Sequence, residues 1–110
     1  MGLDIEFTQQ KKRICPHCGK ELADPVVIDW ADSSGRVWYP FLESIGYYVP
    51  FLERTKDNDW YGKDMVLTKE QTEAAYRFVK QHEVYNRSTI AMLISSAITK
   101  DDDVVVNANW

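Results

Sequence analysis

The stretch that decides the fold is residues 68–82, TKEQTEAAYRFVKQH, where a helix-start signal precedes a periodic apolar pattern. Thr68 and Gln71 have the spacing of a capping box, in which the two side chains satisfy amide groups left free at the first turn. Four residues then recur at helical spacing and predict one inward-facing stripe: Ala75, Phe78, Val79 and His82. We therefore expect a helix from about residue 69 to His82 or Glu83.

Two further helices are expected around this one. Asn86 or Ser88 can cap a helix that follows directly. Its apolar residues again share one face: Ile90, Leu93, Ile94, Ala97 and Ile98. Earlier in the chain, Pro40 suits a first helical position, and Gly46 can end a short helix with a positive φ. The sequence thus predicts one short helix and two longer C-terminal helices.

Extended segments flank these helices. Leu3, Ile5 and Phe7 alternate with acidic residues, which is the period of a half-buried strand. Pro25–Trp30 reads as a second strand closed by a turn at residues 32–35, and β-branched Val104–Val106 suit a last one. Trp30 and Trp38 are expected in the core. The fold class is therefore α+β, with a small antiparallel sheet beside the helices.

Length and charge restrict the class of protein. A chain of 110 residues with 45% hydrophobic content can bury one core, so we expect a single domain over residues 1–110. No apolar run approaches the roughly 18 residues of a membrane span, and no secretory signal precedes the first strand. We expect a cytoplasmic protein. The net charge of −4 disfavours broad binding to nucleic acid, whose phosphates attract a basic face.

Both cysteines lie in residues 14–22, ICPHCGKEL. A Cys-x-x-Cys turn brings two sulfurs to one point, so Cys15 and Cys18 form half of a zinc site. His82, expected to face inward, is the best third ligand in the chain, and a carboxylate such as Asp4 or a ligand from a second copy could complete the four. The motif therefore predicts zinc, although a lone inward histidine can also be simply hydrogen-bonded in a core.

Redox catalysis is the rival interpretation of the same motif. Cys-Pro-His-Cys occurs in thioredoxin-like oxidants, where a helix beginning at the first cysteine lowers the pKa of its thiol. Here Gly19 follows the second cysteine at once and Pro25 restricts any helix soon afterwards, so the context disfavours this chemistry. No nucleophile with a partnering base and no glycine-rich phosphate loop is recognisable elsewhere. We expect a protein that is not an enzyme.

The order of landmarks resembles a group of short, largely uncharacterised proteins of bacteriophages and mobile elements. The resemblance covers most of the chain and is carried by these segments: residues 1–5 (MGLDI), residues 15–19 (CPHCG), residues 41–48 (FLESIGYY), the two late helices and residues 104–106 (VVV). It implies an accessory protein of a mobile element acting in a bacterial host cell. In size and origin the chain is similar to anti-CRISPR inhibitors, which implies a host protein target such as a CRISPR effector nuclease.

Two partner-binding segments follow from this expectation. Trp60 and Tyr61 lie in a polar loop and could anchor an interface, because aromatic side chains give large contact areas. The acidic run Asp101, Asp102 and Asp103 could meet a basic groove on a target. The alternative is a zinc-knuckle protein that binds nucleic acid through the basic residues around the motif: Lys11, Lys12, Arg13 and Lys20.

Overall fold

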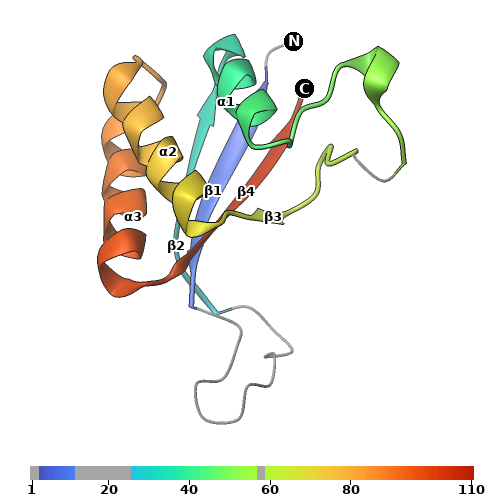
Figure 1. The fold of residues 1–110 in the computed structure, drawn as a ribbon. Coiled ribbons are helices and arrows are strands. Elements are labelled where there is room, and N and C mark those ends of the chain that lie inside the picture. The colour runs from blue at the N-terminus through green and yellow to red at the C-terminus, as the bar shows by residue number, and fades with distance from the viewer. Residues whose placement is uncertain (1–2, 12–25, 57–58) are drawn as a thin grey trace, which may run out of the picture.

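The computed structural model describes residues 3–11, 26–56 and 59–110 (Figure 1). The Cys-x-x-Cys motif with Cys15 and Cys18 lies outside these residues, so the zinc prediction stays a prediction.

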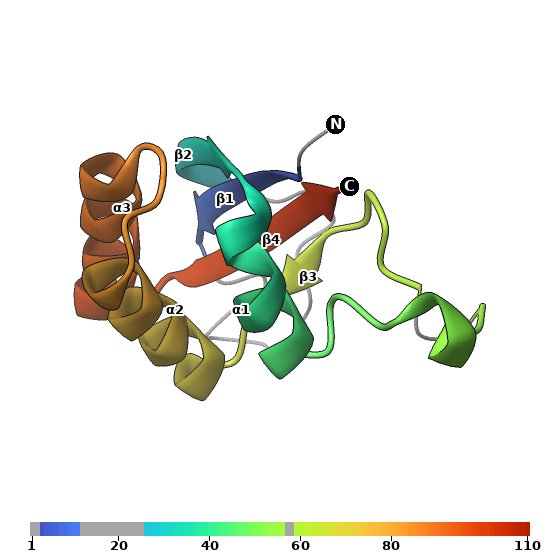
Figure 2. The same cartoon turned by 90° about the horizontal axis from the view of Figure 1, so that it is seen from above.

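Four strands form one antiparallel sheet in the order β2-β1-β4-β3. The strands are β1 (Asp4–Gln10), β2 (Val27–Ser34), β3 (Met65–Val66) and β4 (Asp103–Asn109). The helices are α1 (Tyr39–Ser44), α2 (Lys69–Gln81) and α3 (Arg87–Lys100), with short 3-10 turns η1 (Arg36–Trp38) and η2 (Phe51–Glu53). Viewed from above, the three helices lie on the same side of the sheet (Figure 2). This arrangement confirms the predicted α+β class.

The sheet therefore has a covered face, beneath the helices, and an open face. Alternation along β1 separates them: Ile5 and Phe7 are buried against the helices, whereas Asp4 and Glu6 are exposed on the other side. The register shows which residues of β2 and β4 lie opposite the residues of β1 on this face. We define the open face by these residues: Asp4, Glu6, Thr8 and Gln10 of β1, Trp30, Asp32 and Ser34 of β2, and Val105, Asn107 and Asn109 of β4.

The two long helices begin and end close to the predicted positions. The capping box of α2 is confirmed, because the Gln71 amide donates to Thr68 Oγ1 and the Thr68 amide donates to Gln71 Oε1. Asn86 precedes α3 as expected, but its side chain donates to the Asp32 carbonyl of β2 and does not cap the helix. Gly46 follows α1 with φ of 77°, the left-handed conformation that its lack of Cβ permits.

Strand β2 departs from its prediction in two ways. The expected turn at residues 32–35 is wrong, because Asp32 and Ser34 continue the strand by pairing with Glu6 and Asp4. The expected burial of Trp30 is also wrong: its side chain is 58% exposed. The register explains this, since Trp30 lies opposite Thr8 on the open face. Trp38 is fully buried, as predicted.

The predicted inward position of His82 is wrong as well. His82 is exposed at the C-cap of α2, where its extended backbone leaves the helical spiral and takes the side chain off the buried stripe. Its ring stacks on Phe78 at 4.2 Å between centroids, and Nδ1 lies 3.1 Å from the Phe78 carbonyl oxygen. The described residues on either side of segment 12–25 are Lys11 and Val26, and the Lys11 amide donates to the Val26 carbonyl next to the first residue of β2. Because Cys15 and Cys18 lie outside the described ranges, a role of His82 as a zinc ligand beside them stays a prediction.

Candidate functional site

The open face places two carboxylates directly opposite each other. Glu6 on β1 pairs in register with Asp32 on β2, and Asp4 lies two residues before Glu6 on the same face. Successive same-face residues on a strand are about 6.6 Å apart, and residues opposite each other are about 5 Å apart. Like charges at such positions destabilise a sheet. We therefore take this arrangement as a candidate functional feature.

These carboxylates have no compensating partner in the described part of the chain. Across residues 3–11, 26–56 and 59–110, no hydrogen bond or ion pair reaches the carboxylates of Asp4, Glu6 or Asp32. By contrast, Asp64 before β3 accepts a hydrogen bond of 2.8 Å from Asn107 Nδ2. The open face thus carries acidic groups whose charge is available to a partner.

A hollow of about 400 Å³ lies on this face. The residues that line it come from β1, β2 and the segment before β3: Glu6, Thr8, Gln10, Val27, Trp30 and Asp64. Trp30 is its large aromatic side chain, and Val27, which is 52% exposed, supplies a second apolar surface. Aromatic area beside a few polar groups is the usual composition of a binding site.

Gln10 is the unusual group in this hollow. It is only 5% exposed, and its side-chain amide has no hydrogen-bond partner among the described residues. A buried amide left unpaired costs about 1–3 kcal/mol. Its neighbour Gln9, also buried but on the covered face, donates from Nε2 to Asp102 Oδ2 and Ser96 Oγ. Within the described ranges, the Gln10 amide therefore keeps hydrogen-bonding capacity for a ligand.

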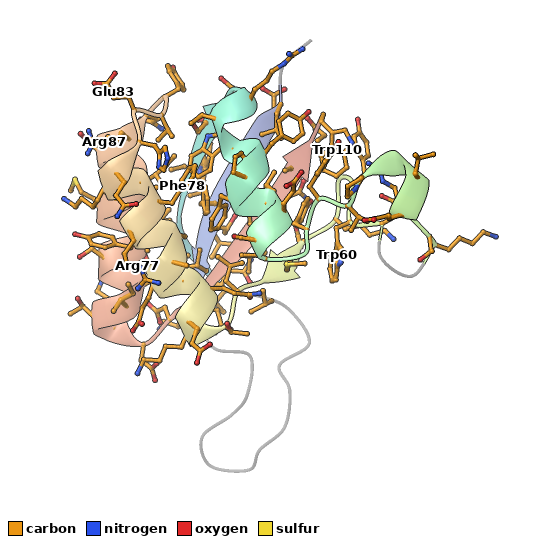
Figure 3. The ribbon with its side chains drawn as sticks, turned by 45° about the horizontal axis from the view of Figure 1, so that its top comes forward. Trp60, Arg77, Phe78, Glu83, Arg87 and Trp110 are labelled. Carbon is orange, nitrogen blue, oxygen red and sulfur yellow. The ribbon has the colours of Figure 1, made fainter. Side chains whose placement is uncertain are left out.

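The two aromatic residues of the predicted contact loop, Trp60 and Tyr61, both pack against other aromatic side chains of the same chain. The Trp60 ring lies 6.2 Å from that of Tyr47, and the Tyr61 ring stands edge-on to Trp110 at 4.9 Å. Figure 3 shows Trp60 and Trp110 beyond α1, away from Phe78 on α2. Tyr61 keeps 49% of its surface exposed. Of the two predicted contact residues, Tyr61 has the larger exposed share, and a role for either in binding stays a prediction.

Tyr47 fixes this loop to the sheet. Its hydroxyl donates to the Lys63 carbonyl at 2.6 Å and accepts from the Ala108 amide at 2.8 Å. Burial raises the pKa of the Tyr47 phenol above its ordinary value, an effect that the backbone hydrogen bond at Ala108 opposes. Tyr47 therefore stays neutral and acts as a structural link, outside the open face.

The acidic run has three different environments. Asp101 ends α3 in the left-handed conformation, Asp102 accepts the hydrogen bond from Gln9, and Asp103 begins β4. The run lies at the opposite end of β4 from the aromatic loop, because the Gly62 amide donates to Ala108. The structure thus does not bring the two predicted contact segments together.

Sequence reasoning missed the open face. The acidic residues of β1 were visible as the polar half of an alternating pattern, but their pairing with Asp32 depends on the register of two strands separated by a long segment. Within the three described ranges, no group of three or more His, Cys, Asp or Glu side chains could hold a metal ion.

No family model, curated protein or solved structure gave a significant match to this chain. Among the described helices, none combines the length and apolar character needed to cross a bilayer.

Proposed function

We propose that this chain is a non-enzymatic inhibitor that binds a protein of the bacterial host and blocks it by occupancy. The open face is its contact surface. The resemblance to phage and mobile-element proteins makes a host defence factor the leading target, with a CRISPR effector nuclease as the first to test.

The position of Trp30 is the observation that carries this proposal. A tryptophan that is 58% exposed on the sheet face opposite the helices, beside carboxylates that have no partner in the described ranges, has the composition of an interface hot spot. Like charges directly opposite each other on neighbouring strands, as at Glu6 and Asp32, are in general unfavourable, and a basic partner offsets such a cost. Nucleases that bind nucleic acid carry basic grooves, so their surfaces suit this charge.

Titration of the purified chain against a sensitive effector nuclease tests the proposal. Occupancy predicts a plateau at a fixed molar ratio, and Trp30→Ala weakens inhibition by at least tenfold if this residue is a hot spot. Tyr61→Ala tests the aromatic loop in the same assay. Tyr85→Ala is the matched control, because Tyr85 is 69% exposed in the turn between α2 and α3.

Two results would contradict the proposal. One molecule could inactivate many targets that stay inactive after its removal, which requires catalysis. Alternatively, Trp30→Ala and Tyr85→Ala could inhibit equally well, which would exclude the open face as the contact surface.

A further inference from the structure

We infer that the hollow on the open face binds an arginine side chain of the partner protein. This inference rests on the proposed function only in taking the ligand to be part of a protein. It adds the chemical group that is recognised and the residues that recognise it.

Trp30 provides the surface on which a guanidinium can stack. Arginine favours the faces of aromatic rings, and tryptophan is the best of these partners. Trp30 lies opposite Thr8, and Glu6 and Gln10, which flank Thr8 on the same face of β1, line the same hollow. A planar cation lying on the ring therefore has polar groups of β1 at its edge.

The charge of the hollow selects a cation. Glu6 and Asp64 both line it, and lining residues with a positive charge are absent from the described part of the chain. A carboxylate or phosphate would meet repulsion here, whereas a guanidinium can donate two parallel hydrogen bonds to a carboxylate such as Glu6. Exposed Val27 can pack against the methylene groups that precede the guanidinium.

Gln10 and Thr8 distinguish arginine from lysine. The amide oxygen of Gln10 and the hydroxyl oxygen of Thr8 are acceptors on the same strand and face as Glu6. Arginine has five N–H donors in a fixed plane and can bond several such acceptors at once, whereas a lysine ammonium is a compact, strongly hydrated charge. An apolar ligand would leave the buried amide of Gln10 unpaired.

The test uses the full chain and three blocked pentapeptides, in which arginine, lysine or citrulline stands between glycines. Citrulline has nearly the shape of arginine without its charge. We expect the arginine peptide to shift the NMR signals of the Trp30 indole N–H and the Gln10 side-chain amide, with weaker shifts from lysine and none from citrulline. Trp30→Phe and Trp30→Ala variants assign the indole signal and keep the test usable if one of them is unstable.

Variants locate the binding in the hollow. Glu6→Gln and Trp30→Ala should each weaken binding of the arginine peptide about three- to tenfold, because each removes one favourable interaction with the cation. Glu83→Gln is the matched control for charge, since exposed Glu83 lies at the turn between the long helices (Figure 3). The Glu83→Gln variant should bind the arginine peptide as tightly as the unchanged protein does.

Equal shifts from arginine and citrulline peptides would overturn the inference, as would equal affinity for arginine and lysine. So would shifts confined to residues outside the hollow. If the peptides fail but Trp30→Ala still abolishes inhibition of the nuclease, arginine recognition is wrong and the proposed function stands. If the arginine peptide binds in the hollow but inhibition is catalytic, the inference stands and the proposed function is wrong.

Discussion

Trp30 and Trp38 stand near each other in the sequence and on different faces of the same sheet. Trp38 is fully buried on the covered face, its indole N–H donates to Ser33 Oγ at 3.0 Å, and its ring lies 5.2 Å from that of Phe78. Trp30 is more than half exposed on the open face. The comparison separates side chains that hold the fold from side chains that the fold leaves available.

Polar groups follow the same division. On the covered face, Gln9 has partners for its buried amide. On the open face, Gln10 has none among the described residues, and Glu6 faces Asp32. Natural proteins tolerate such local costs mainly where a site needs them. The proposal that the open face contacts a partner rests on this difference.

Replacing each tryptophan by alanine should give the largest difference in the free energy of unfolding between the two faces. Trp38→Ala creates a cavity in the core and should lower the free energy of unfolding by about 3–5 kcal/mol. Trp30→Ala removes an exposed side chain and should change it by less than about 1 kcal/mol. Urea unfolding followed by circular dichroism measures both. Similar losses for the two variants would remove the distinction between the faces.

Replacing the two glutamines by leucine should change the free energy of unfolding in different directions. Gln9→Leu leaves Asp102 and Ser96 without their donor and should cost about 2 kcal/mol. Gln10→Leu removes a buried amide that has no partner among the described residues, so the free energy of unfolding of this variant should be unchanged or higher by up to about 1 kcal/mol. The same unfolding experiment compares them. A large loss with Gln10→Leu would show that its amide has a structural partner.

Tyr47 belongs to the covered side and links stability to pH. Tyr47→Phe loses the hydrogen bonds to Lys63 and Ala108 and should cost about 1–2 kcal/mol at neutral pH. The pKa of Tyr47 is raised in the folded protein, so the unfolded chain releases its proton first as the pH rises. Stability should therefore fall above pH of about 10, the ordinary tyrosine pKa. This decline should be shallower in Tyr47→Phe, as thermal melts across alkaline pH can test.

The smallest effect is expected from the carboxylates of the open face. Glu6→Gln or Asp32→Asn removes a like-charge pair and should raise the free energy of unfolding by about 0.2–1 kcal/mol. The gain should shrink in high salt, which screens exposed charges. Glu83→Gln provides the control. Destabilisation by both open-face variants would mean that these carboxylates support the fold.

The helices were predictable because their signals are local. The capping box of Thr68 and Gln71 and the spacing of Ala75 and Val79 lie within a few turns of one another. The continuation of β2 to Ser34 was not predictable from local sequence, because pairing with β1 overrides the turn preference of Asp32 and Ser34. The two-residue strand β3 is too short to leave a periodic pattern.

The candidate site was less predictable than the fold. Trp30 is apolar in sequence, and only the pairing with Thr8 shows which face it occupies. Likewise, nothing local distinguishes Gln9 from Gln10, although one faces the helices and the other does not. For His82, the helical pattern ran one residue too far, because the chain leaves the helix there.

The strand order has a consequence for how the chain folds. The two inner strands, β1 and β4, are the first and last of the sheet in sequence, so their pairing closes a very long loop. Such contacts raise the contact order and slow folding, whereas the α2–α3 pair can form early from neighbouring segments. During synthesis, β1 can pair with β2 but waits with one edge unsatisfied until β4 emerges from the ribosome. That interval is when a nascent chain is most exposed to misfolding and most dependent on chaperones.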